Sequence, residues 1–281
     1  MLAANFIDSN LESEITQNGY VVIPNFLNRE EVNYLYEVYT NYHNEREIGC
    51  WNSLYDLPLG YGMEISEKIT ALAQQKLGNY FKNWKFPVAN FIVKNPGQGH
   101  ESLVHRDDSM HDESQIQYRQ CWVPLVDLTP ENGALYVVPG SHRLFTDERP
   151  MFARWPFEHL RPRLEKEFVP IYAKAGDMIV YLEKTLHGSP KNFTNEPRPV
   201  FQGGVMHQDA TPLFTKYIKE TNEVESYDVD LNFFLNKEYL KPVVDAKYPL
   251  VKRVKFEVQE ISEADIDLFY ENFKKESLLL V

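Results

Sequence analysis

The feature that most constrains the fold is a series of short β-rich runs that starts at Phe86 and fills the middle of the chain. Turn signals separate the runs, such as Asn-Pro-Gly at 95–97 and Glu-Asn-Gly at 131–133. The runs are KFPVANFIVKNPG, QYRQCWVPLVDL, ALYVVPG, KEFVPIYAKAGD, MIVYLEK and RPVFQGGVMHQ. Many short strands joined by such turns are typical of two packed sheets with a cavity between them. The sequence therefore predicts a mainly β sandwich or jelly roll.

Helices are predicted on both sides of this β-rich part. Near the N-terminus, the buried strand in NGYVVIPNFL precedes a helix whose start is marked by a capping box of Asn28 and Glu31. A second helix is predicted over Glu64–Leu77 because Gly78 ends its apolar periodicity. The tail from Ile261 has the spacing of an amphipathic helix.

We expect a single domain over residues 1–281 with three parts. Residues 1–85 form an N-terminal region of helices and strand, 86–210 form the jelly-roll core, and 211–281 form a C-terminal extension that ends in a helix. The core is interrupted at about 144–164 by an insertion too long for a hairpin turn, which favours a lid or binding loop. Its candidates for substrate contact are Arg154, Trp155, His159 and Arg161.

Charge and composition exclude several classes of function. The net charge of −12 argues against nonspecific binding to nucleic acid or anionic membrane, which needs clustered Lys and Arg. Cys50 and Cys121 are the only cysteines, so neither a disulfide framework nor a Cys-based zinc motif is expected, and both are predicted to be buried small residues. The N-terminus lacks a secretory pattern and no run approaches a membrane span. We expect a soluble, cytoplasmic protein that acts on a small molecule, and the sequence predicts no particular oligomeric state.

Three residues in the β-rich part have the pattern of a metal site. His105 and Asp107 lie two apart in LVHRDDS, and His187 directly follows the run MIVYLEK. On a strand, side chains two apart point to the same face, so both can reach one metal, and a neighbouring strand can supply the third ligand. Two imidazoles and one carboxylate hold ferrous iron on one face and leave the opposite positions open.

Two further residues fit the co-substrate of such a centre. A keto acid that chelates the metal needs a cation for its far carboxylate. Arg198 begins the strand after His187, and a guanidinium pairs with a carboxylate through two parallel hydrogen bonds. Ser189 offers a hydroxyl donor to the same carboxylate.

Other residues near the triad are interpreted without a metal role. Asp108 is an alternative to Asp107, but three residues from His105 its side chain points to the other strand face. His111 is interpreted as a pocket-rim residue, and His142 as a residue that stabilises a turn or the cavity edge.

Taken together, the segments resemble the phytanoyl-CoA dioxygenase family of iron(II)/2-oxoglutarate oxygenases. The resemblance runs from about Gly19 to His207 and covers NGYVVIPNFLNREEV, VHRDD, CWVPLVDLTPENGALYVVPGSHR and AGDMIVYLEKTLHGSPKN with PRPVFQ, in the family's order. It implies a double-stranded β-helix core of the jelly-roll, cupin-like type. It implies the cofactors iron(II), 2-oxoglutarate and dioxygen. The residues it assigns are His105, Asp107 and His187 as iron ligands, Arg198 as the 2-oxoglutarate anchor, Ser189 and Trp122 in the lining of the co-substrate site, and Lys94 as a contributing basic position.

The resemblance implies hydroxylation of an unactivated C–H bond in a small organic substrate, with release of succinate and CO₂. In the family's halogenases a small residue replaces the carboxylate ligand, so Asp107 favours hydroxylation. Desaturation, epoxidation and cyclisation use the same ligands and stay open. A cupin-like metal-binding protein that does not use 2-oxoglutarate is a further alternative, and in it Arg198 and Ser189 would have no task.

Overall fold

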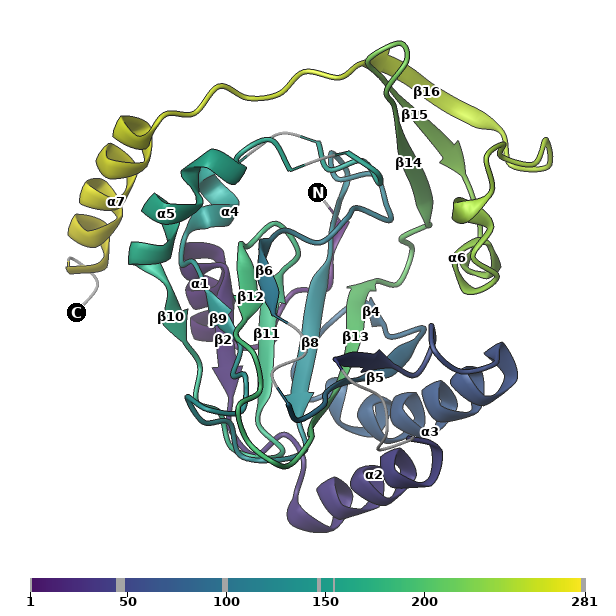
Figure 1. Cartoon of the computed structure of the whole chain (residues 1–281), viewed down its shortest axis with the longest axis vertical. Helices are drawn as coiled ribbons and strands as arrows, with labels where there is room; N and C mark the ends of the chain where they lie inside the picture. The colour runs from purple at the N-terminus through teal and green to yellow at the C-terminus, as the bar shows by residue number, and fades with distance from the viewer. Residues whose placement is uncertain (1, 44–48, 98–100, 146–147, 154, 279–281) are drawn as a thin grey trace.

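Two facing antiparallel sheets form the centre of the molecule. The computed structural model describes residues 2–43, 49–97, 101–145, 148–153 and 155–278 (Figure 1). The larger sheet has the order β2 (Tyr20–Ile23), β11 (Met178–Leu182), β8 (Arg119–Pro124), β13 (Arg198–His207), β5 (Ala89–Lys94) and β3 (Cys50–Asn52), and β4 (Trp84–Lys85) pairs with β13. The smaller sheet has the order β10 (Val169–Pro170), β9 (Tyr136–Val137), β12 (His187–Ser189) and β6 (Ser102–His105). The predicted mainly β, double-stranded β-helix core is confirmed.

Side-chain alternation along β8 separates the inside of the barrel from its helical cover. Trp122 packs inward in one buried cluster with Val137 and Val200, whereas Cys121 and Val123 belong to the cluster on the other face. The edge strand β3 places Cys50 at the surface, so the prediction that both cysteines are buried is wrong for Cys50. A cysteine at a sheet edge lacks a neighbouring strand on one side to cover it.

Helices α1 (Ser9–Asn18), α2 (Arg29–Tyr42) and α3 (Leu59–Leu77) cover the outer face of the larger sheet (Figure 1). The capping box of Asn28 and Glu31 is confirmed, because each side chain accepts a hydrogen bond from the other residue's backbone N–H. Helix α3 begins at Leu59 rather than at the predicted Glu64. Gly62 lowers the helix propensity of this stretch, so the sequence predicts a later start. The packing requires glycine at this position, because a Cβ would lie 2.8 Å from the carbonyl oxygen of Ser53.

The insertion packs against the end of the chain. It contains the end of α4 (Ser141–Leu144), a 3₁₀ turn at Glu158–Leu160 and α5 (Arg161–Leu164). Helix α7 (Glu263–Leu278) starts at the predicted capping residues Ser262 and Asp265 and lies beside α5 (Figure 1). Its apolar stripe joins one buried cluster that contains Val104, Phe145, Phe157, Leu160, Leu186, Ile266, Tyr270 and Phe273.

A three-stranded arm of β14 (Leu213–Ile218), β15 (Glu223–Asp228) and β16 (Leu250–Lys255) stands beside the barrel, with the short helix α6 (Leu231–Leu235) against it (Figure 1). The backbone of Met151, in the insertion, bonds to the arm at Thr215 and Tyr217. The arm was not predicted from the sequence. Every residue of β16 is exposed, so this strand lacks the apolar alternation that marks a strand. In the described part of the chain, we find no helix with the length and apolar character needed to cross a bilayer.

His142 gives a prediction about the pH dependence of stability. Its Nε2 donates a hydrogen bond to the carbonyl oxygen of Thr16 (3.0 Å), which confirms a structural role, and burial lowers its pKa from 6.5 to about 4. At a pH between about 4 and 6.5, His142 is protonated in the unfolded chain but stays neutral in the folded protein. We expect the free energy of unfolding of the metal-free protein to fall as the pH drops through this interval.

The variant His142→Gln keeps a side-chain N–H donor but has no titrating ring. We expect it to lose less stability than the unchanged protein over the same pH interval, as measured by urea midpoints at several pH values. Parallel pH profiles for the two proteins would contradict the assignment.

Candidate metal centre

Two neighbouring strands of the smaller sheet bring the predicted ligands together. His105 on β6 is paired directly with His187 on β12, and Asp107 follows β6 in the adjoining loop. Asp107 Oδ1 lies 3.8 Å from His105 Nε2 and 3.5 Å from His187 Nε2. One ligand atom from each residue lies within 4.8 Å of the other two, and this is the single such group found among the described residues. The three predicted ligands therefore converge.

Backbone carbonyls orient both imidazoles toward the shared centre. His105 Nδ1 donates to the carbonyl oxygen of Leu103 (2.7 Å), and His187 Nδ1 donates to that of Thr185 (2.9 Å). A carbonyl only accepts, so each Nδ1 carries the hydrogen and each Nε2 keeps its lone pair for a metal. Such hydrogen bonds fix the tautomer and the ring orientation of histidines that bind metals. The donor set and its orientation fit an iron(II) ion.

The placement of Asp107 corrects one step of the sequence argument. Strand β6 ends at His105, so strand alternation does not align Asp107 with it or turn Asp108 away. Contacts in the loop hold Asp107 instead. Gln120 Nε2 donates to its carboxylate (3.4 Å), and Arg149 donates to its backbone carbonyl. Asp108 is exposed and lies outside the ligand group.

Arg198 is a buried cation whose donors are not all used. It begins β13, is 2% exposed, and its guanidinium carbon lies 5.0 Å from the ring centre of Trp122. Its Nε and Nη1 have no hydrogen-bond partner among the described residues. Burial lowers the pKa of Arg198 to about 10, so it still carries a positive charge at neutral pH. Burying an unpaired charge is costly, and an anion bound at this position would offset that cost.

One wall of the barrel connects this cation with the triad. Gln120 and Trp122 are two apart on β8, so their side chains share a face and are spaced by roughly 7 Å along the strand. Gln120 contacts Asp107, and Trp122 lies against Arg198. A molecule that binds at the triad and extends past Trp122 therefore reaches the guanidinium.

Ser189 and Lys94 lie at the same end of the barrel. Ser189 is on β12, two residues after His187, and is buried. Lys94 is paired with Arg198 across β5 and β13, and its Nζ donates to the carbonyls of Ser189 (2.7 Å) and Pro190. Burial and the neighbouring Arg198 charge lower the pKa of Lys94 to about 7. Lys94 thus fixes the end of β12, and its predicted contact with a co-substrate stays a prediction.

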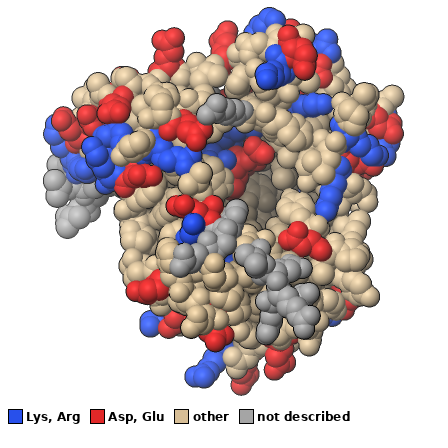
Figure 2. Space-filling view, viewed as in Figure 1, with Lys and Arg blue, Asp and Glu red and all other residues tan. Residues whose placement is uncertain are grey.

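Part of the insertion reaches the metal centre. Trp155 lines a small cavity of about 70 Å³ together with His105 and Asp108. Figure 2 shows that this side of the molecule is hollowed between the barrel and the arm, with acidic side chains around the hollow. The other candidates for substrate contact are not placed in this cavity: His159 is exposed, Arg161 pairs with Glu158 (3.4 Å), and Arg154 lies outside the described residues.

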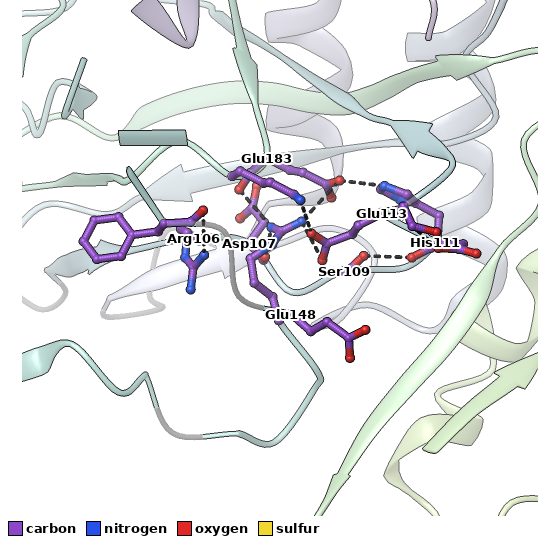
Figure 3. Close-up of polar contacts among 12 residues, drawn as sticks. Arg106, Asp107, Ser109, His111, Glu113, Glu148 and Glu183 are labelled. Carbon is purple, nitrogen blue, oxygen red and sulfur yellow. Dashed lines mark hydrogen bonds and ion pairs between the residues drawn. The ribbon is translucent and has the colours of Figure 1, made fainter. Parts of the chain in front are cut away.

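A buried network of charges next to Asp107 was missed in the sequence (Figure 3). Arg149 Nη2 lies 3.1 Å from Glu113 Oε1 and 3.3 Å from Glu183 Oε1. Glu113 also pairs with Lys184 (2.8 Å). Burial raises the pKa of Glu113, but the charges of Arg149 and Lys184 outweigh this effect and hold the pKa well below its usual range. Isolated charged residues in loops are usually solvated, so the sequence held no signal for this network.

His111 belongs to the same network. It was predicted at the rim of the pocket, but it is 5% exposed and its Nε2 lies 2.7 Å from Glu183 Oε1. Its ring stacks on Tyr118 with 5.7 Å between the ring centroids. The prediction that His111 lies at the pocket rim is wrong, because its imidazole contacts the buried carboxylate of Glu183 in the interior.

Comparisons with known proteins match one family profile and several curated relatives. The family profile described as "Phytanoyl-CoA dioxygenase (PhyH)" matches residues 42–200. A phytanoyl-CoA dioxygenase of Arabidopsis thaliana is 31% identical over 167 residues, which is 56% of this chain and 56% of the relative. The matched stretch spans about half the length, or less, of the curated relatives.

Solved structures share the fold at lower identity. EctD from S. alaskensis, described with 2-oxoglutarate and 5-hydroxyectoine, superposes with a TM-score of 0.55 at 20% identity, covering 76% of this chain and 80% of EctD. The carbocyclase SnoK from nogalamycin biosynthesis, described as non-heme and alpha-ketoglutarate-dependent, gives a TM-score of 0.54 at 18% identity, covering 88% of this chain and 97% of SnoK.

Proposed function

Because this chain belongs to the phytanoyl-CoA dioxygenase family, we propose that it is an iron(II)/2-oxoglutarate-dependent oxygenase that hydroxylates an unactivated C–H bond of a small organic substrate. The observation that carries the proposal is the wall of β8, where Gln120 contacts the ligand Asp107 and Trp122 contacts Arg198. Two donor atoms of Arg198 have no partner in the part of the chain that the structure describes. A short diacid that chelates a metal at one end and pairs with a guanidinium at the other fits this spacing.

Each residue has a task in this reaction. His105, Asp107 and His187 would hold the iron(II) ion. When bound, the iron together with 2-oxoglutarate and dioxygen supplies the oxidising chemistry, and 2-oxoglutarate leaves as succinate and CO₂. Arg198 binds the carboxylate of 2-oxoglutarate that is remote from the metal, through two parallel hydrogen bonds. Because the guanidinium lies over the ring of Trp122, it orients the co-substrate along that side chain.

The substrate is proposed to enter through the hollow beside the arm. The cavity there is lined by His105, Asp108 and Trp155, and by Phe256 at the end of the arm. A C–H bond held in it lies next to a metal ligand and away from Arg198. The insertion and the arm therefore determine which substrate fits, while the barrel supplies the chemistry common to the family.

Hydroxylation is proposed over halogenation because Asp107 keeps its carboxylate in the ligand group, in the position that a halide would need. Desaturation, epoxidation and cyclisation use the same ligands and are the alternatives, and SnoK, which shares the fold, is a carbocyclase. A cupin-like protein that does not use 2-oxoglutarate would give no role to Arg198, which is buried and has two donor atoms without a partner in the described ranges.

Anaerobic titration tests the proposal. Addition of iron(II) and then 2-oxoglutarate to the protein is expected to give a weak visible charge-transfer band, because the keto acid chelates the iron. Two controls match this titration. Succinate replaces 2-oxoglutarate and has no keto group, and zinc(II) replaces iron(II) and has a filled d shell, so neither should give the band. Admission of air with a substrate panel should then release succinate. Iron binding without the band in the presence of 2-oxoglutarate would favour the cupin-like alternative.

A further inference from the structure

We propose that Arg149 is a positioning residue that holds two of the three metal ligands in place, an inference that rests on the proposed metal centre. Arg149 comes from the insertion, and its Nη1 donates to the backbone carbonyls of Asp107 and Glu183, the latter at 3.0 Å. Asp107 is itself a ligand. Glu183 begins the turn that leads from β11 to His187. One guanidinium therefore joins the two segments that carry these ligands.

The turn after Glu183 transmits this contact to His187. Thr185 N–H donates to the carbonyl of Leu182 (2.8 Å), and the carbonyl of Thr185 accepts the hydrogen bond from His187 Nδ1 (2.9 Å). The position of the Thr185 carbonyl sets the direction of the imidazole. A shift of the Glu183 carbonyl would therefore rotate the ring and move Nε2 away from the shared centre.

The guanidinium is itself held firmly. Arg149 is 6% exposed, and its Nη2 lies 3.1 Å from Glu113 Oε1 and 3.3 Å from Glu183 Oε1. The loop after Asp107 is also tied to the backbone of Arg149, because Ser109 N–H donates to its carbonyl oxygen (3.2 Å). Arg149 thus fixes the loop through its side chain and its main chain.

The charges in the network distinguish Arg149 from a substrate anchor. Arg149 and Lys184 face two acids, Glu113 and Glu183, so the cations are matched inside the protein. Arg198, by contrast, has no carboxylate partner within the part of the chain that the structure describes, so its charge needs an external anion. Arg149 therefore acts on the ligands through the backbone. It also lines the cavity assigned to the substrate, so its positioning role is tested with the metal alone.

Substitution by lysine separates positioning from charge. Lysine keeps the positive charge but has a single ammonium, which cannot reproduce the planar set of donors that serves two carbonyls and two carboxylates. The probe is cobalt(II) alone, without 2-oxoglutarate or dioxygen. We expect Arg149→Lys to bind it at least about tenfold more weakly than the unchanged protein does. We also expect an altered cobalt(II) visible spectrum, because that spectrum reports the ligand geometry.

Arg119→Lys is the matched control. Arg119 is fully buried and pairs with Glu12 (2.8 Å), but it serves the N-terminal segment and contacts no ligand. Both lysine variants are expected to lower the melting temperature of the metal-free protein, whereas Arg119→Lys should keep the cobalt(II) affinity and spectrum. A third variant, Glu113→Gln, removes one carboxylate and leaves both carbonyl contacts, so we expect a smaller loss of affinity than for Arg149→Lys.

The outcomes separate this inference from the proposed function. Unchanged cobalt(II) affinity and spectrum in Arg149→Lys would overturn the positioning role while leaving the metal centre intact. Equal losses in Arg149→Lys and Arg119→Lys would assign Arg149 a purely structural role, as would an Arg149→Lys protein that fails to fold while Arg119→Lys folds. Failure of the unchanged protein to bind cobalt(II) would overturn the metal centre itself and this inference with it.

Discussion

A protein that carries His187→Ala is expected to release no succinate from 2-oxoglutarate and to bind iron(II) more than about 100-fold more weakly. Loss of a residue that only supports a ligand typically costs about 10- to 100-fold in metal affinity, so loss of a ligand should cost more. His187 is paired directly with His105, and its Nε2 lies 3.5 Å from Asp107 Oδ1. Among the residues that the structure describes, no other side chain completes a ligand group with these two. Iron(II) binding is measured by anaerobic equilibrium dialysis, and succinate is measured after air is admitted.

His159→Ala serves as the control for this experiment. His159 is an exposed histidine of the insertion and lies outside the ligand group, so its loss should leave iron binding as it was. The melting temperature of each metal-free variant shows whether the fold is retained, since His187 is buried. Wild-type iron affinity in a folded His187→Ala protein would show that the centre is elsewhere.

Arg198→Ala is expected to raise the apparent KM for 2-oxoglutarate by about 30-fold or more, with iron(II) affinity nearly unchanged. Removal of one partner of a buried, hydrogen-bonded charge pair typically costs about 2 kcal/mol or more, which corresponds to this factor. Arg198 reaches the co-substrate at the end remote from the metal ligands, because it contacts Trp122 and not Gln120 on the wall of β8. The two ends of the site should therefore respond separately.

Two further variants sharpen this test. Arg198→Lys keeps a positive charge but loses the bidentate contact, so its KM should fall between those of the unchanged protein and Arg198→Ala. Lys94→Met removes the neighbouring charge, whose Nζ already bonds to the carbonyl of Ser189, and its effect on KM should be smaller. Steady-state succinate release gives the KM, and dialysis gives the iron affinity. Equal losses of co-substrate and iron binding in Arg198→Ala would contradict its role as an anchor.

The parts of the fold that depend on local chemistry could be predicted from the sequence. The turns at 95–97 and 131–133 bound real strands, and the capping box at Asn28 marks the start of α2. The ligand group was predicted from the His-x-Asp pair and the remote His187 together with the family resemblance, because a His-x-Asp pair alone is common in sequences. Arg198 was predicted at the start of a strand, and it lies there.

Features that depend on long-range packing could not be predicted in this way. Asp107 reaches the centre from a loop, and its orientation depends on Gln120 and Arg149, which are distant in the sequence. The early start of α3 depends on the close approach of Gly62 to Ser53. Each of these requires knowledge of which segments meet in space, and no periodicity along one segment carries that information.

The packing of α7 has a consequence for how the protein is made. Its residues Ile266 and Tyr270 share a buried cluster with Val104 and Leu186, which directly precede His105 and His187 in their strands or turns. During translation the barrel emerges from the ribosome well before residues 263–278, so this apolar surface stays in contact with water, or with a chaperone, until the helix arrives. The centre should therefore become able to take up metal only after α7 has docked, and a nascent chain stalled before residue 263 should remain metal-free.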